Sequence, residues 1–143
     1  MRAEVKGIET VKDLLIRPRE TRQVISDLLD RKQQLEGRLR MRSATYEGKV
    51  RTSKVDLIGE IMTELTDLEA ELQKCMVEYQ HASCCALSSI HRLSNPTEQT
   101  VLVLYYVSGL SMEEVAAKME RSIRKLYNYK NDGIKHLADL LNS

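Results

Sequence analysis

Phenylalanine and tryptophan are absent from this sequence of 143 residues, and its only aromatic residues are six tyrosines. A compact core of this size usually contains several Phe or Trp residues, because each of them buries a large apolar area. The chain also has only two prolines and six glycines, whereas charged residues make up 30% of it. Its apolar residues are mainly Leu, Ile, Val, Met and Ala, which suit contacts between helices. This composition predicts an all-α protein built from long helices.

Several other features are missing as well. The three cysteines, Cys75, Cys84 and Cys85, are odd in number and form no C-x-x-C pair, so a disulfide framework is not expected. No apolar run approaches the ~18 residues that a membrane-spanning helix needs. The N-terminus also lacks the pattern of a signal peptide. We therefore expect a cytoplasmic protein that does not associate with membranes.

The net charge is +1, but it is distributed unevenly along the chain. Residues 1–55 contain 14 Lys and Arg against eight Asp and Glu, a net charge of +6. Residues 56–95 contain two against seven, a net charge of −5, and residues 96–143 contain six of each. The near-neutral total therefore conceals a basic block followed by an acidic block. The basic block could contact DNA phosphates, although a solvated helix face is the more ordinary interpretation.

The first part of the chain predicts a helix, a connector and a second helix. Residues 1–16 carry only a weak signal, and Pro18 is expected to reset the chain and to begin a helix that runs to about Met41. Residues 43–54 show no sustained periodicity, which indicates a connector. Asp56 is a suitable N-cap for the helix that follows.

The second helix carries the clearest periodic signal in the sequence. Apolar or small residues recur at alternating steps of three and four over about five heptads, which is typical of coiled-coil packing. The members of this seam are Ile58, Ile61, Leu65, Leu68, Leu72, Cys75, Tyr79, Ala82, Ala86, Ser89 and Leu93.

The nearest partner for this seam is the preceding helix, folded back as an antiparallel hairpin over residues 1–94. Basic residues of the first helix would then face acidic residues of the second. Exposed ion pairs contribute about 0–1 kcal/mol each, so charge would select this pairing more than stabilise it. Because the first helix is the shorter one, part of the seam is left for another chain. We therefore expect a homo-oligomer formed through the N-terminal helices.

The dipeptide Asn95-Pro96 ends the hairpin and begins a second domain, residues 95–143. Gly109 suits the left-handed position that closes a helix. Ser111 and Glu114 have the spacing of a capping box, and Ser122 can cap a further helix. These signals predict three helices, Thr97–Val107, Met112–Met119 and Ile123 to about Leu140.

A short helix, a tight turn and a longer helix make up the helix-turn-helix arrangement. The second helix of such a pair enters the DNA major groove, where its N-terminal half meets base edges. Arg can pair with guanine, and Asn can pair with adenine. The residues expected to point outward there are Arg124, Lys125, Tyr127, Asn128 and Asn131. The residues expected to point inward are either Ile123 or Leu126 in the first turn, and either Tyr129 or Lys130 in the next.

Phosphate contacts are expected beside this helix. Cationic side chains at Lys118, Arg121 and Lys130 are suited to hold the DNA backbone. Ser111, at the N-terminus of the preceding helix, can donate to a phosphate as well. Ser122 lies in the turn that leads into the groove, so it completes the predicted DNA-binding set.

Within this segment, LSMEEVAAKM (110–119), SIRKL (122–126) and IKHL (134–137) are separated by short spacers. This pattern of roughly 40 residues resembles the fourth region of bacterial RNA polymerase sigma factors, which reads the upstream promoter element. The resemblance implies a phosphate-binding hydroxyl at Ser111. It implies base contacts at Ile123, Arg124, Tyr127 and Asn128. Because Ile123 and Tyr127 replace more polar residues of that family, the DNA sequence read should differ from a standard promoter element.

The whole chain is similar to a family of small phage and prophage proteins, related to late-gene transcription activators of the RinA and ArpU kind. A long helical hairpin joined to a sigma-like C-terminal unit carries this resemblance. It implies a sequence-specific transcriptional regulator that acts in the bacterial host cytoplasm, with RNA polymerase as a possible second partner. The sequence leaves two alternatives open: the small DNA-recognising subunit of a phage packaging (terminase) motor, and a protein-interaction module that does not bind DNA.

The zero net charge of residues 96–143 argues against tight DNA binding by one copy, and two copies in a dimer would restore affinity. A metal set drawn from His81, Cys84, Cys85 and His91 matches no familiar zinc spacing, so no metal or other cofactor is expected. The sequence shows no catalytic carboxylate pair, no nucleophile with its base and no Gly-rich phosphate loop. We therefore expect a protein that is not an enzyme.

Overall fold

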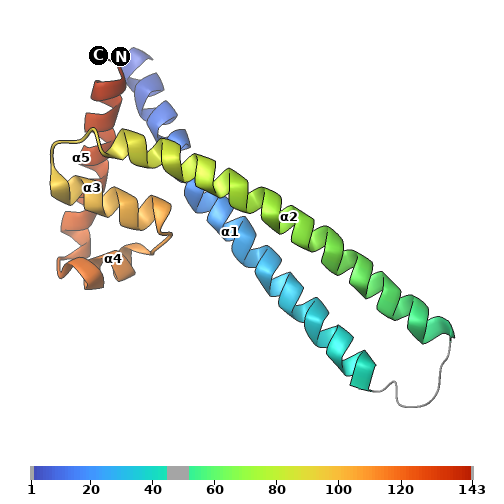
Figure 1. The fold of residues 1–143 in the computed structure, drawn as a ribbon. Helices are drawn as coiled ribbons and strands as arrows, with labels where there is room; N and C mark the ends of the chain where they lie inside the picture. The colour runs from blue at the N-terminus through green and yellow to red at the C-terminus, as the bar shows by residue number, and fades with distance from the viewer. Residues whose placement is uncertain (1, 45–51, 143) are drawn as a thin grey trace. The chain divides into compact units, whose positions relative to one another are not determined.

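The computed structural model of this chain describes residues 2–44 and 52–142, and every regular element in them is helical (Figure 1). The predicted all-α class is therefore confirmed, with a long helical pair followed by smaller helices. Most of the connector expected at 43–54, residues 45–51, lies outside the described residues. The elements are α1 (Arg2–Ala44), α2 (Thr52–Ile90), α3 (Pro96–Leu102), the π-helix η1 (Val103–Val107), α4 (Met112–Met119) and α5 (Ile123–Asn142).

The chain divides into two compact units. Unit 1 consists of residues 1–22 and 78–143, and unit 2 consists of residues 23–77. The boundary expected near residue 95 is the start of α3, but it is not where the units divide. The reason is that both ends of the helical pair bury apolar side chains among the C-terminal helices, and these ends therefore belong to unit 1.

Pro18 does not begin a helix, which corrects the expectation from the sequence. Instead, α1 runs through Pro18 from Arg2, and the proline side chain is fully buried. A proline inside a helix costs about 3 kcal/mol, since it removes a hydrogen bond and crowds the preceding turn. Val11 and Leu15, on the N-terminal side of Pro18, are fully buried. Burial of such side chains contributes about 1.5–3 kcal/mol each, which is enough to offset the cost of the proline.

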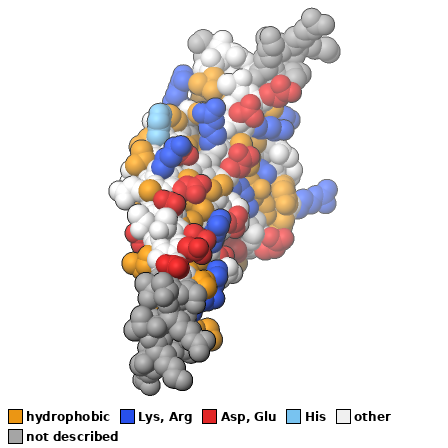
Figure 2. All heavy atoms as spheres, turned by 90° about the vertical axis from the view of Figure 1, so that its right-hand side faces the viewer, with side chains coloured by type: hydrophobic (Ala, Val, Ile, Leu, Met, Phe, Trp, Pro, Cys, Tyr) orange, Lys and Arg blue, Asp and Glu red, His pale blue; other side chains and the backbone are white. Residues whose placement is uncertain are grey.

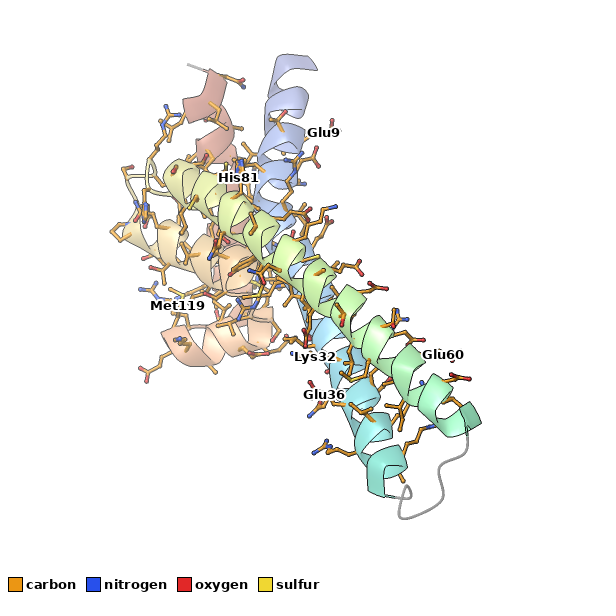
Figure 3. All side chains as sticks on the ribbon, turned by 45° about the vertical axis from the view of Figure 1, so that its right-hand side comes forward. Glu9, Lys32, Glu36, Glu60, His81 and Met119 are labelled. Carbon is orange, nitrogen blue, oxygen red and sulfur yellow. The ribbon has the colours of Figure 1, made fainter. Side chains whose placement is uncertain are left out.

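Unit 2 consists of the distal parts of α1 and α2, which lie side by side and antiparallel (Figure 1). Leu35 of α1 packs with Ile61, Leu65 and Leu68 of α2, as the heptad seam predicts. The expected pairing of basic and acidic faces occurs at Lys32, whose Nζ lies 3.7 Å from Glu69 Oε1. The same ammonium lies 3.9 Å from Glu36 Oε1, one turn along α1 (Figure 3).

The limits of α2 differ from the sequence expectation at both ends. The helix begins at Thr52, so Asp56 lies inside its first turns and does not cap it. It ends at Ile90, where the amide of Leu93 donates to the carbonyl of Ile90 over 3.0 Å in a short terminal turn. Over the described residues, neither α2 nor any other helix has the length of apolar sequence that crossing a bilayer requires.

The main core of unit 1 joins the beginning of α1 and the end of α2 to α3, η1 and α5. Gly133 of α5 allows a close approach there, because a Cβ at this position would lie 3.1 Å from Leu102 Cδ1 of α3. The buried members of this core are Val11, Leu15, Ala86, Ile90, Leu93, Leu102, Tyr106, Val107, Ile134, Leu137 and Ala138. The C-terminal helices therefore share their core with residues 11–15, far away in sequence.

Replacing Leu15 with alanine tests this shared core. Leu15 is fully buried in unit 1, so Leu15→Ala should lower the free energy of unfolding of that unit by about 2–5 kcal/mol. Urea unfolding monitored by circular dichroism measures the change. The matched control is Leu141→Ala, at a residue that is 41% exposed, for which the loss should be about 0.5 kcal/mol. Equal losses in the two variants would contradict the packing of α1 into unit 1.

Candidate nucleic-acid interface

The first helix of the predicted helix-turn-helix begins at the expected place. Asn95 is its N-cap, with its Oδ1 accepting a hydrogen bond of 2.9 Å from the amide of Thr97. Pro96 occupies the first helical position, where its missing N–H costs nothing. Gln99 Nε2 donates to the carbonyl of Leu93, which ties this turn to the end of α2.

A π-helical turn, η1, follows α3, and nothing in the sequence predicts it. Five residues, Val103–Val107, form it, and the amide of Ser108 donates to the carbonyl of Val103 over 2.9 Å. The wider turn rotates the following side chains, so that Tyr106 and Val107 are buried while Tyr105 is only half-buried. Single π-helical turns occur often near functional sites.

The turn after η1 closes as the sequence predicts. Gly109 has φ +75°, the left-handed conformation that glycine adopts without strain. Ser111 then caps α4: its Oγ accepts from the amide of Glu114 and donates to Glu114 Oε1, both over 3.2 Å. The predicted N-cap and its pairing with Glu114 are therefore confirmed.

The turn between α4 and α5 comprises residues 120–122. Glu120 has φ 55° and ψ 44°, so this residue makes the left-handed bend that glycine often provides. Ser122 immediately precedes α5. Its Oγ accepts a hydrogen bond of 3.4 Å from the amide of Lys125, and its carbonyl accepts one of 3.2 Å from the amide of Leu126. This geometry delivers the N-terminal half of α5 directly after a tight turn, as a helix-turn-helix requires.

The polar residues at the start of α5 project into solvent. Leu126 takes the inward position and is fully buried, whereas Ile123 is 39% exposed, which resolves the choice left open by the sequence. Exposure is what base contacts need, although the contacts themselves remain predictions. We call the following five exposed residues the reading residues: Arg124, Lys125, Tyr127, Asn128 and Asn131.

The residues predicted to hold phosphates have different surroundings. Lys118, Arg121 and Ser122 are exposed, and Arg121 Nη1 donates to Tyr129 Oη over 3.1 Å. Ser111 is half-buried in its capping interaction. Lys130 is half-buried, with its Nζ 4.2 Å from the centre of the Tyr105 ring. Lys118 and Arg121 are therefore the more accessible cations of this set.

Burial is the main cause that lowers the pKa of Lys130, and the positive charges of Arg19 and then Lys12 lower it further. Arg19 lies on the same tyrosine, with its guanidinium carbon 4.1 Å from the ring centre of Tyr105. Two cations therefore contact one aromatic ring, each through a cation–π interaction. Burial also raises the pKa of the neighbouring Tyr106 to about 12, so its hydroxyl remains neutral.

Sequence reasoning missed the role of α1 and α2 in supporting this unit. Arg19 Nη1 donates to the carbonyl of Tyr105 at 2.7 Å and to that of Leu110 at 3.0 Å. Tyr79, expected as a core residue, is half-buried and donates its hydroxyl to the carbonyl of Val107 over 2.7 Å. These side chains donate hydrogen bonds to main-chain carbonyls in and just after η1, where the helix itself provides no donor. Each of these hydrogen bonds joins residues that are more than 25 positions apart, so no local sequence pattern could have predicted it.

Glu98 and His136 form another pair that the sequence did not indicate. Glu98, in the first turn of α3, is only 2% exposed. Its Oε1 lies 2.7 Å from Nδ1 of His136 on α5, whose side chain is 57% exposed. The pair joins α3 to the half of α5 that follows the reading residues. It satisfies a buried carboxylate that would otherwise be costly.

The cysteines and histidines near the end of α2 do not assemble a metal site. Cys85 Sγ lies 3.6 Å from His81 Nδ1, one helical turn away, and both side chains are exposed (Figure 3). Within the described residues, no three His, Cys, Asp or Glu side chains gather as a metal site would need. Cys75, Cys84 and Cys85 are free thiols.

A protein-family model described as "Protein of unknown function (DUF1492)" matches residues 36–138. The match covers more than half of the chain and includes residues 36–77 of unit 2, the turn at 120–122 and the reading residues. The chain belongs to this family. No curated protein and no solved structure matches this chain. Because the description of the DUF1492 family names no activity, the geometry and chemistry of the chain are what bear on its function.

Removing the guanidinium of Arg19 tests its support of the helix-turn-helix. Arg19→Ala leaves two main-chain carbonyls without their donor, so the free energy of unfolding of unit 1 should fall by about 1–3 kcal/mol. Thermal and urea unfolding measure this change. Arg17→Ala removes an exposed guanidinium from the same helix and should cost no more than about 0.5 kcal/mol. If the two variants unfold alike, the Arg19 hydrogen bonds do not stabilise the unit.

Proposed function

We propose that α4, the turn at 120–122 and α5 bind double-stranded DNA, with α5 in the major groove. The observation that carries this proposal is the arrangement of Arg124, Asn128 and Asn131 on one exposed face of α5, directly after a capped turn. These residues are spaced four and three apart, so they lie on the same side of the helix. The opposite side, with Leu126 and Leu137, is buried in unit 1.

The side-chain chemistry of this face suits base edges. Arg124 can donate two hydrogen bonds to a guanine, and each asparagine can pair with an adenine. Ile123 and Tyr127 are 39% and 45% exposed, although large apolar side chains are normally buried. Contact with thymine methyl groups gives such residues a role. The proposed site therefore combines polar and apolar contacts to bases.

Phosphate contacts flank these residues. Lys118 near the end of α4 and Arg121 in the turn are exposed cations. Cations at these positions can hold the DNA backbone and fix the register of α5 in the groove. Acidic side chains balance these cations, because residues 96–143 contain six Lys and Arg and six Asp and Glu. The same mixture of charges is seen on the side of the molecule drawn in Figure 2, where Asp and Glu are interspersed with Lys and Arg. Binding by one copy is therefore weak and sensitive to salt.

A second copy of the chain compensates for this weakness. Unit 2 exposes several large apolar side chains, and a pair of helices can bury only one side of each helix. Their burial against another chain would add apolar contact area and bring two DNA-binding units together, which raises the effective concentration of the second unit. These exposed residues are Val24, Leu29, Met41, Met62, Met76 and Val77.

The biological role that fits this chemistry is transcriptional regulation in a phage or prophage, within the cytoplasm of the bacterial host. The resemblance of residues 110–137 to sigma region four supports this role, and it makes RNA polymerase a second candidate partner. The proposal involves no catalysis and no cofactor. Specific DNA binding is the property on which the role depends.

Replacing two reading residues should abolish sequence discrimination. In Arg124→Ala/Asn128→Ala, the removal of each base-reading side chain should cost about 1–3 kcal/mol on a specific site, with little change on random DNA. Fluorescence anisotropy measures both affinities, using fragments from the region upstream of the neighbouring genes at two salt concentrations.

The matched control for this experiment is Arg17→Ala/Gln80→Ala. It also removes one guanidinium and one amide from exposed positions of unit 1. The control should bind as the wild type does. If the Arg124/Asn128 variant keeps full discrimination, α5 is not the reading helix. Wild-type protein with no preference over random DNA at ~100 mM salt would refute sequence-specific regulation.

The oligomeric state distinguishes regulation from DNA packaging. We expect a dimer or tetramer, measured by light scattering during gel filtration, and a closed ring of eight or more copies would favour a terminase subunit instead. Met76→Glu/Val77→Glu should weaken self-association, because it adds charge to residues that are 55% and 60% exposed. Gln73→Glu/Gln80→Glu adds the same charge at exposed polar positions of α2 and should leave it unchanged. A monomeric wild-type chain would contradict the proposal.

A further inference from the structure

We propose that α1 adds a second contact to the DNA backbone: Lys12 of α1 and Lys135 of α5 hold a phosphodiester group beside the reading residues. This inference rests on the proposed DNA binding by α5. It extends the interface to the N-terminal helix, whose basic residues would otherwise form only a solvated face.

The two lysines line one cavity of about 270 Å³ within unit 1. Ile8 and Lys12 form its α1 side, and Asn131, Ile134 and Lys135 form its α5 side. Ile8 and Ile134 provide an apolar floor, whereas both ammonium groups and the Asn131 amide belong to exposed residues. All three polar side chains can donate hydrogen bonds, as the oxygens of a phosphate require.

The cavity is continuous with the proposed base contacts. Arg124, Asn128, Asn131 and Lys135 are separated by four, three and four residues, so they form a single stripe along α5. The stripe extends for about 16 Å, since each residue of a helix advances by 1.5 Å. The major groove is ~12 Å wide, and this width separates the two phosphate backbones that border it. When the N-terminal half of α5 meets base edges, the far end of the stripe is therefore at the distance of a flanking phosphate.

The electrostatics of the cavity favour an anion. Among the described residues, ion pairs join Lys32 to Glu36 and Glu69, and His136 to Glu98, and none engages Lys12 or Lys135. Burial is the main cause that lowers the pKa of Lys130 nearby, and the positive charges of Arg19 and then Lys12 lower it further, so cations already repel one another here. A phosphodiester would relieve that repulsion.

The neighbouring acidic residues limit the site without filling it. Glu9 lies on the side of α1 that points away from α5 (Figure 3). Asp139 follows Lys135 by one turn and lines the adjacent cavity, together with Ile8 and Asn142. The basic stripe therefore ends at Lys135, which indicates one phosphate contact at this place rather than a longer track along α5.

The salt dependence of DNA binding tests the inference. For each phosphate contact that a substitution removes, the slope of log K against log [KCl] should fall in magnitude by about 1. Lys12→Ala and Lys135→Ala should each lower it by about 1, and the double variant by about 2. At ~0.1 M salt, the double variant should bind roughly tenfold to fiftyfold more weakly. The decrease should be equal for a specific duplex and a scrambled one, because a phosphate carries no sequence information.

The matched control is Arg17→Ala/Lys74→Ala, which removes two positive charges from exposed positions and should keep the wild-type slope. If the wild type binds DNA and the Lys12/Lys135 variant has the same slope of log K against log [KCl], this inference is overturned and the proposed function is unaffected. A decrease confined to the specific duplex would also overturn it, since it would indicate a base contact. If the wild type binds no DNA, the proposed function fails, and this inference fails with it. Tight binding of inorganic phosphate at Lys12 and Lys135, without any effect of the variants on DNA affinity, would assign the cavity to a free anion instead.

Discussion

The two hydrogen bonds from Arg19 to the carbonyls of Tyr105 and Leu110 are the contact on which the helix-turn-helix depends. A π-helical turn followed by a left-handed glycine leaves main-chain acceptors open in a half-buried place, and unsatisfied acceptors there are costly. Tyr79 supplies a further donor, to Val107. The geometry before α4 is therefore specified by side chains from α1 and α2. Unit 1 includes the beginning of α1 and the end of α2 as well as the helix-turn-helix.

Local signals in the sequence were enough to predict the helix-turn-helix. Asn95, Ser111 and Ser122 cap helices, and Gly109 closes one, because capping and left-handed turns depend on residues within a few positions. Heptad spacing likewise predicted the packing of Ile61, Leu65 and Leu68. Burial and exposure along α5 follow from its period, with Leu126 inside and the reading residues outside.

The failures have a common physical cause, which is tertiary contact between distant segments. Pro18 is a helix-starting signal by itself, and only the burial of Val11 and Leu15 against the C-terminal helices carries α1 through it. The π-helical turn, the Glu98–His136 pair and the position of Lys130 on the Tyr105 ring also depend on such contacts. Periodicity describes one helix at a time and does not identify its partner.

Both chain ends lie in unit 1, where a Cβ at Gly7 would lie 2.6 Å from Asn142 Nδ2 (Figure 1). Unit 2 is thus, topologically, an insertion that leaves unit 1 along α1 and re-enters it along α2. Removing equal numbers of heptads from its two helices would keep the register of the seam and leave every residue of unit 1 in place. The length of the hairpin can therefore be changed in engineered variants without any change to α4, the turn at 120–122 or α5.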